Sequence, residues 1–354
     1  MPTSRSPRLC VLAPTPMLTV TIESSSDPDH PEVHVHPGGQ GLWVARMAYS
    51  LGAEVVVCGP FGGEAGTVLG HLAQAEHLDV RAVGYVGGNG AYLHDRRDGE
   101  RHELAFMPPA KLDRHELDDL YGTVLVEGLD ADVCVITGAH PAPLLPASFF
   151  GRLAGDLRAA GVRVVADLSG QAAREVAAAG ADVLKMSHEE LIEAGLAADD
   201  SMHALRDGAR TLLHHDEPVG TGRTDGRPAG TDGADRADGA DGADGRQDTD
   251  SRAGRHVGVG AMIVSRAADP GLLVTADRVS SVVPPSVTTV DHRGAGDSMT
   301  AGIAVGLGRG MDLTEAVRLG AAAGSLNVTR RGLGTGRREQ IERFAAQVVM
   351  VDID

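Results

Sequence analysis

Short runs rich in β-branched residues alternate with amphipathic, Ala- and Leu-rich segments along most of this chain. The expected strands are 9–13, 54–58, 132–137, 162–167, 182–186 and 256–265. The expected helices are 40–51, 65–76, 147–160, 171–179, 188–195, 201–214, 297–308, 312–329 and 337–350. Such alternation is typical of a mostly parallel sheet whose two faces are covered by helices. The sequence therefore predicts an α/β fold with a buried central sheet.

Three segments interrupt the alternation. Residues 17–36 and 80–106 predict short strands joined by polar or Gly-containing turns, and together they could form a small antiparallel flap beside the main sheet. Residues 217–255 contain an Ala-Asp-Gly near-repeat with almost no apolar side chains. Such a segment buries too little surface to offset the entropy of ordering it. We therefore expect a disordered insertion in a surface loop.

Composition narrows the partners and the location of the chain. The net charge of −17 argues against nucleic acids and anionic membranes, because both are bound by basic surfaces. No apolar run approaches the roughly 20 residues that a membrane-spanning helix needs. Cys10, Cys58 and Cys134 are far apart and form no C-x-x-C pair. This spacing predicts buried free thiols rather than disulfides or a zinc site, and it fits the cytoplasm.

The segment with the clearest chemistry is 288–310, TTVDHRGAGDSMTAGIAVGLGRG. A strand-like run leads into Gly294, Ala295 and Gly296, and an amphipathic helix begins at about Asp297. Small residues let backbone N–H groups face a ligand, and the helix N-terminus adds about half a positive charge. These features predict an anion hole for a transferred phosphoryl group. Asp297 at its rim could take the proton from an attacking hydroxyl.

This segment resembles the second signature of the PfkB/ribokinase family of carbohydrate kinases. Residues 36–63, HPGGQGLWVARMAYSLGAEVVVCGPFGG, resemble the first signature. The tail at 321–336 resembles the nucleotide-side segment of the family, and LKMSHEEL at 184–191 resembles its K-P-N-x-x-E-L element. The resemblance covers nearly the whole chain apart from 217–255. Within the family, the chain is most similar to the 1-phosphofructokinase/tagatose-6-phosphate kinase branch.

The resemblance implies one kinase domain over 1–354 with a ribokinase-like fold, a three-layer α/β/α sandwich with a mostly parallel sheet and a β-flap lid. It also implies ATP and Mg²⁺ as cofactors and a sugar or sugar phosphate as acceptor. A monovalent cation beside the anion hole and a homodimer through the lid are further features that the resemblance leaves open.

Carried over position by position, the resemblance makes Asp297 the general base and Gly294, Ala295 and Gly296 the anion hole. Glu190 would help to hold Mg²⁺ through water, since this ion keeps most of its water ligands. The residues implied on the nucleotide side are Ser265, Asn327, Gly332 and Gly334. The residues implied on the acceptor side are Gly38, Gly39, Gln40, Gly41, Trp43 and Thr19.

The departures from the family pattern lie mainly on the acceptor side. Trp43, Gln40 and Thr19 stand where the family has its sugar-contacting Asn, Lys and Asp. Ser187 replaces the Asn of the N-x-x-E element. The lid motif T-R-x-N reads Asn-Gly-Ala-Tyr at 89–92, so its Arg and Asn are lost. The identity of the acceptor is therefore the least constrained part of the interpretation.

Two questions about the acceptor side stay open in the sequence. A sugar-phosphate pocket needs fixed cations, and the side chains that could replace the lost ones are Arg46, Arg96, Arg97 and His94. Trp43 could stack on a ligand or pack in the core.

Three functions fit these observations. The first is an ATP-dependent kinase for a hydroxyl of a sugar or sugar phosphate, because the base and the anion hole are retained. The second is a kinase for a nucleoside or another ring compound, because Trp43 replaces a sugar-binding polar residue. The third is a non-catalytic ligand-binding protein on the kinase fold, against which the intact Asp297 argues.

Overall fold

The computed structural model describes residues 5–27, 29–139, 144–213, 258–267, 269–330 and 334–353. The expected insertion at 217–255 and the expected nucleotide-side residue Gly332 lie outside the described residues.

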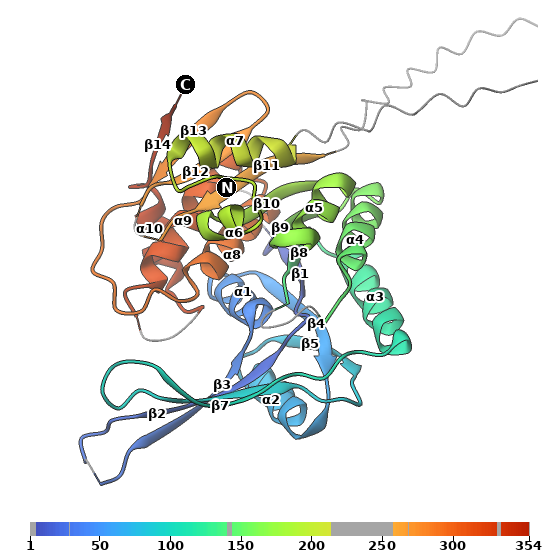
Figure 1. Ribbon diagram of the computed structural model, residues 1–354, viewed down its shortest axis with the longest axis vertical. Helices are drawn as coiled ribbons and strands as arrows, with labels where there is room; N and C mark the ends of the chain where they lie inside the picture. The colour runs from blue at the N-terminus through green and yellow to red at the C-terminus, as the bar shows by residue number, and fades with distance from the viewer. Residues whose placement is uncertain are drawn as a thin grey trace, which may run out of the picture.

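Within these ranges, ten strands make one large sheet (Figure 1). In spatial order they are β14 (Val349–Asp352), β13 (Val279–Val283), β12 (Gly271–Thr275), β11 (Val259–Ser265), β10 (Ala181–Ser187), β9 (Arg163–Asp167), β8 (Val133–Thr137), β1 (Arg8–Leu12), β4 (Glu54–Phe61) and β5 (Asp79–Gly84). The strands from β11 to β5 run parallel to one another. At the other edge β12, β13 and β14 are antiparallel. The sheet is therefore mostly parallel, as predicted.

Helices cover both faces of the large sheet, because neighbouring residues of a strand point to opposite sides. In β1, Leu9 and Val11 are buried in one core, and Cys10 and Leu12 are buried in the other. The first core lies under α1 (Gln40–Ser50), α2 (Gly63–Ala75), α8 (Ala295–Gly308), α9 (Leu313–Asn327) and α10 (Arg338–Ala345). The second lies under α3 (Arg114–Leu129), α4 (Ala147–Ala159), α5 (Gly170–Ala179), α6 (His188–Glu193) and α7 (Met202–Leu213). The predicted three-layer α/β/α sandwich is confirmed.

A separate small sheet contains, in the described residues, four strands. Their order is β3 (Glu32–Gly38), β2 (Met17–Glu23), β6 (Gly90–Asp95) and β7 (His102–Met107). This sheet extends away from the main body beside α2 (Figure 1). Its outer pairs are antiparallel, but β2 and β6 run parallel. The expectation of a wholly antiparallel flap was therefore wrong at the central pair.

The second expected flap segment, 80–106, is divided between the two sheets. Its first strand, β5, pairs in parallel with β4 at the edge of the large sheet, and Val83 is buried in the main core. Only β6 and β7 belong to the small sheet. The division is not visible in the sequence, because the alternation within a strand does not specify which strand it pairs with.

The carboxyl ends of β8, β9, β10 and β11 meet at one edge of the large sheet, because these neighbours run parallel. The start of α8 lies against the same edge, since Thr300 on α8 donates a hydrogen bond to Asp167 at the end of β9. In open parallel sheets, ligands bind beyond the carboxyl ends of the strands. The fold thus brings the glycine turn at 294–296 to the edge where a site is expected.

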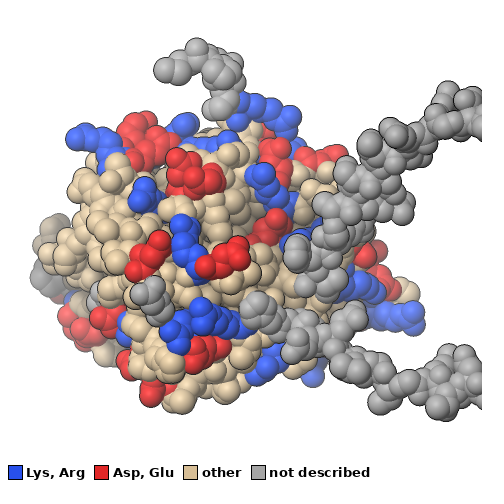
Figure 2. All heavy atoms as spheres, turned by 90° about the horizontal axis from the view of Figure 1, so that it is seen from above, with Lys and Arg blue, Asp and Glu red and all other residues tan. Residues whose placement is uncertain are grey.

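Charged side chains of both signs are interspersed on the face of the molecule shown in Figure 2, where neither sign covers a broad area. This face lacks the continuous basic surface that nucleic acids require. Among the described residues, no helix combines the length and the apolar character of a membrane span.

Candidate active site

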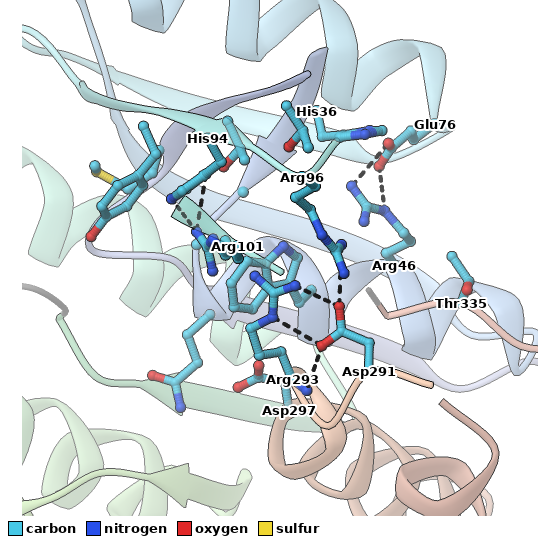
Figure 3. A pocket seen from close by; sticks show the side chains of 18 of the residues that line it. His36, Arg46, Glu76, His94, Arg96, Arg101, Asp291, Arg293, Asp297 and Thr335 are labelled. Atoms are coloured by element: carbon cyan, nitrogen blue, oxygen red, sulfur yellow. Dashed lines mark hydrogen bonds and ion pairs between the residues drawn. The ribbon is translucent and has the colours of Figure 1, made fainter. Parts of the chain in front are cut away.

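A cavity of about 690 Å³ lies between the small sheet and the carboxyl edge of the large sheet (Figure 3). It is lined by several of the residues that the sequence singles out: Thr19, Gly38, Gly39, Gln40, Trp43, Glu190 and Asp297. Residues far apart in the chain therefore converge on one space large enough for a small-molecule ligand.

The start of α8 is open to an anion. Gly294 is the residue before the helix and has φ 69°, a left-handed conformation that glycine adopts without strain. No side chain caps this end of the helix, and the first helical hydrogen bond runs from the Ser298 N–H to the Gly294 carbonyl at 2.9 Å. The amides of Ala295, Gly296 and Asp297 precede that bond and are available to a ligand.

A buried ammonium group lies directly behind the glycine turn. Lys185 Nζ donates to both carboxylate oxygens of Asp167 at 2.9 Å, and Thr300 Oγ1 donates to Asp167 Oδ2 at 2.6 Å. A Cβ added to Gly296 would lie 2.8 Å from Lys185 Nζ, so a larger residue could not fit there without a shift. Burial acts to lower the pKa of Lys185, but the Asp167 and Asp297 carboxylates outweigh it, and the pKa is raised. Lys185 is therefore a fixed positive charge beneath the anion hole.

Asp297 lines the cavity from the first turn of α8. Its pKa is raised to about 7, mainly by burial and then by the negative charge of Asp167, while Lys185 and a hydrogen bond from Gln40 oppose the rise. A base works best when its pKa lies near the operating pH, because it is then both deprotonated and a good proton acceptor. The environment of Asp297 is therefore suited to general-base catalysis.

Gln40, which stands where the family has a lysine, is tied to this carboxylate. Its amide group donates a hydrogen bond to Asp297, and its Oε1 accepts from the Gly138 N–H at 3.0 Å. Gly138 immediately follows β8, so Gln40 links the end of a strand to the predicted base. The side chain is placed to orient Asp297.

We expect Gln40→Ala to raise the pKa of Asp297 further, because the hydrogen bond that stabilises the carboxylate is lost. Activity at pH 7 should fall a few-fold, with little change well above that pH. The pH profile of kcat/KM measures the shift, and Gln171→Ala, an exposed glutamine on α5, is the control. An unmoved acid limb in the Gln40 variant would contradict the assigned hydrogen bond.

Glu190 lines the same cavity from α6 and is held by a capping box. Its Oε2 accepts from the Ser187 N–H at 2.7 Å, and its own N–H donates to Ser187 Oγ at 3.2 Å. No group of three or more candidate metal ligands occurs among the residues that the structure describes. One fixed carboxylate facing the cavity fits Mg²⁺ held through water, because this ion keeps most of its waters beside phosphate oxygens.

Of the expected nucleotide-side residues, the three that the structure describes do not line this cavity: Ser265, Asn327 and Gly334. Ser265 ends β11 beside Ser187 at the end of β10. The Asn327 side chain is buried; it donates to the Arg293 carbonyl at 2.7 Å and accepts from the Gly334 N–H at 2.9 Å. Asn327 thus supports the turn before α8 through backbone contacts.

The acceptor-side glycines are close-packed positions around the start of α1. Gly39 has φ 103°, and a Cβ there would lie 2.4 Å from the Thr15 carbonyl oxygen. Gly41 is packed against Ala13 and does not line the cavity. Trp43 does line it, whereas the buried face of α1 contains Leu42, Val44, Ala45, Met47 and Ala48. The structure therefore places the Trp43 side chain at the cavity rather than in the core.

A carboxylate of near-neutral pKa beside the predicted anion hole suits the transfer of a phosphoryl group to a hydroxyl. The fold and this arrangement thus define a kinase for a small molecule. The model of the family described as "pfkB family carbohydrate kinase" matches residues 16–215 and 239–340. The chain belongs to this family of carbohydrate kinases.

Curated relatives extend over almost the whole chain. ATP-dependent 6-phosphofructokinase isozyme 2 of Mycobacterium tuberculosis (strain ATCC 25618 / H37Rv) is 26% identical in an alignment of 353 residues that covers 96% of this chain and 89% of the relative. The 1-phosphofructokinase of Bacillus subtilis (strain 168) is 26% identical and covers 89% of this chain and 86% of its own length. Phosphofructokinase-2 from Escherichia coli in complex with potassium has a TM-score of 0.72 at 23% identity, covering 96% of this chain and 98% of that one.

Proposed function

We propose that this kinase transfers the γ-phosphoryl group of ATP to a hydroxyl of a sugar phosphate, with Asp297 as the general base. The observation that carries the proposal is the position of the Asp297 carboxylate, which lines the cavity in the first turn of an uncapped helix, where burial and then Asp167 raise its pKa. The names of the curated relatives, 6-phosphofructokinase and 1-phosphofructokinase, support a phosphorylated sugar as acceptor.

In the proposed reaction, Asp297 accepts the proton of the acceptor hydroxyl while that oxygen bonds to the γ-phosphorus and the bond to the ADP oxygen breaks. The amides of Ala295, Gly296 and Asp297 would stabilise the charge on the phosphoryl oxygens, with the ammonium of Lys185 beneath them. Mg²⁺, held through water by Glu190, would neutralise phosphate charge when bound. The small sheet would act as a lid that excludes water.

The function is tested by ADP release from Mg-ATP with separate acceptors. Turnover of fructose 1-phosphate, fructose 6-phosphate or tagatose 6-phosphate is the expected result. A nucleoside or other ring acceptor is the second candidate, because Trp43 lines the cavity and could stack on a planar ring. Turnover of nucleosides alone would replace the first proposal by the second, and tight binding without turnover would favour a non-catalytic protein.

Because Asp297 acts as a base only when it is ionised, kcat/KM should depend on pH. We expect kcat/KM for the acceptor to be constant above pH about 7 and to fall by about tenfold per pH unit below it, because only ionised Asp297 accepts the proton. The pH profile of kcat/KM measures this limb. A profile that stays flat to pH 5 would remove Asp297 from the role of base.

We further propose a homodimer that forms through the small sheet. Five large apolar side chains on its edge strands are exposed, Val33 (60%), Val35 (41%), Leu104 (53%), Phe106 (38%) and Met107 (49%), and exposed apolar surface favours contacts between subunits. Sedimentation equilibrium of the wild type and of a Val35→Lys variant tests this assembly. A monomeric wild type would exclude it.

Two further proposals concern the location of the protein and a monovalent cation. We propose a cytoplasmic location, supported by the buried free thiols of Cys10, Cys58 and Cys134. We also propose that a monovalent cation binds near the anion hole, as the potassium complex of the Escherichia coli protein suggests. If a monovalent cation binds there, the enzyme should be more active in potassium salts than in tetramethylammonium salts.

A further inference from the structure

One part of the cavity wall, made of three arginines and Asp291, carries more positive than negative charge, whereas the whole lining also contains Glu23, Glu76, Glu190 and Asp297. Arg96 and Arg101 come from the connection between β6 and β7, and Arg293 comes from the turn before α8 (Figure 3). Among the described residues, one carboxylate pairs with two of these three guanidinium groups: Asp291 lies 2.5 Å from Arg293 Nη2 and 3.4 Å from Arg96 Nη1. Three cations and one anion leave an excess of two positive charges.

Arg101 is the member of this arginine cluster whose charge is least compensated. No carboxylate of the described residues forms an ion pair with it; its Nη2 lies 2.6 Å from His94 Nε2, and its guanidinium lies 5.9 Å from the centre of the Tyr92 ring. Burial and then the charge of Arg293 lower the pKa of Arg101 to about 10, so it stays protonated at neutral pH. Burial and then Arg101 lower the pKa of His94 to about 4, so this ring adds no charge.

Arg46 and Arg97 differ from Arg101, because each forms an ion pair with a carboxylate. Arg46 lines the cavity but forms a bidentate ion pair with Glu76, at 2.7 and 2.9 Å. Arg97 lies outside the cavity, is 57% exposed and pairs with Asp95 at 2.6 Å. The unbalanced charge is therefore confined to Arg96, Arg101 and Arg293, in a chain whose net charge is −17.

Like charges that line one cavity repel each other, and a ligand of opposite charge that binds there compensates them. Guanidinium groups are suited to phosphate, because their planar N–H donors match its oxygens. A phosphate monoester carries close to two negative charges at neutral pH, which equals the excess on this wall.

The location of the cluster indicates which phosphate it would bind. Arg96 and Arg101 lie in the connection between β6 and β7 of the small sheet, and they share the cavity with Thr19, Trp43 and Asp297. The expected nucleotide-side residues Ser265 and Gly334 do not line this cavity. The cluster therefore lies on the acceptor side of the base.

We propose that Arg96, Arg101 and Arg293 bind the phosphate group that the acceptor already carries. These guanidinium groups take over from the family's lysine, which is Gln40 here, and from the arginine missing at 89–92. Asp291 holds Arg96 and Arg293 in place, so the small sheet and the main body supply one anion site between them. The inference rests on the proposed sugar-phosphate kinase function and assigns its acceptor specificity.

Arg101→Gln tests the site most cleanly, because no carboxylate loses an ion-pair partner in this variant. We expect the KM for the sugar phosphate to rise about 10- to 100-fold, the effect of one charge-assisted contact, while kcat and the KM for ATP change little. Arg97→Gln, a nearby exposed arginine, should leave all three constants unchanged. A rise in the KM for ATP in place of the acceptor KM would overturn the assignment.

Binding without turnover separates this inference from the proposed function. Calorimetric titration measures the affinity of the full-length wild type and of the Arg101→Gln variant for four ligands. They are fructose 1-phosphate, fructose 6-phosphate, fructose and inorganic phosphate. We expect a sugar phosphate to bind the wild type at least tenfold more tightly than fructose does, and the variant to lose this preference. The phosphate site would then stand even if no acceptor were phosphorylated. Equal affinity of the wild type for fructose and both sugar phosphates would overturn it.

Discussion

Replacing Asp297 by asparagine should lower kcat by about 10²- to 10⁴-fold, the span usual for loss of a general base. Asparagine keeps the shape of the side chain and its contact with Gln40, but it accepts no proton at neutral pH. The KM values for ATP and acceptor should change much less, since neither substrate depends on this proton transfer for binding. Steady-state kinetics at pH 8 measure both quantities, because Asp297 with a pKa of about 7 is then ionised in the wild type.

The matched control is Asp118→Asn, since this aspartate is exposed on α3 and far from the cavity in the fold. It should keep the kcat of the wild type. If Asp297→Asn retained more than about a tenth of the wild-type kcat, proton removal by this carboxylate would not be a major part of the barrier.

The second large effect is on stability. Lys185→Met should lower the free energy of unfolding by about 3–5 kcal/mol, because the buried Asp167 carboxylate loses its ion-pair partner. Asp167 is 2% exposed and Lys185 is 5% exposed, so water replaces little of the lost interaction. Urea unfolding followed by circular dichroism measures the loss. Removing both charges in Lys185→Met/Asp167→Leu should recover part of it, since no unpaired charge then remains buried.

Lys111 provides the control for this prediction. It is the other lysine of the chain and is exposed, so Lys111→Met should change the free energy of unfolding by less than about 0.5 kcal/mol. A Lys185→Met variant as stable as Lys111→Met would mean that the ion pair beneath the anion hole does not support the fold.

The sequence predicted the layers of the fold but not its edges. Strand–helix alternation located β1, β4, β8, β9 and β10, because each is a short buried apolar run, and all but β1 lie between helices. It missed β12 and β13, which pair as antiparallel neighbours without an intervening helix. It also extended the last helix over 337–350, whereas α10 ends at Ala345 and Val349 begins β14.

One helix was missed although its start signal is present in the sequence. Asp113 and Glu116 form a capping box at the start of α3, and this Asp-x-x-Glu spacing is a recognised signal for a helix N-terminus. The helix has only four buried residues over 16 positions, so its apolar periodicity is weak. The local cap was the better indicator here than the apolar pattern.

The candidate site was predictable where a local motif encodes it. The turn Gly294–Gly296 and the position of Asp297 follow from small residues before a helix. Lys185 was missed, although it lies in the quoted segment 184–191, because its role depends on Asp167 from another strand. The arginine cluster was missed for the same reason: Arg101 and Arg293 are 192 residues apart and meet only in the folded protein.

A single-turnover reaction shows whether the protein transfers a phosphoryl group to a sugar phosphate with Asp297 as the base. The protein, in excess over ATP labelled in its γ-phosphate, is mixed with Mg²⁺ and fructose 1-phosphate or fructose 6-phosphate, and the labelled products are separated. We predict that the label moves to one of these sugar phosphates and that Asp297→Asn slows this transfer by at least about 100-fold. No labelled sugar product from the wild type, or equal rates for the wild type and the variant, would contradict the account.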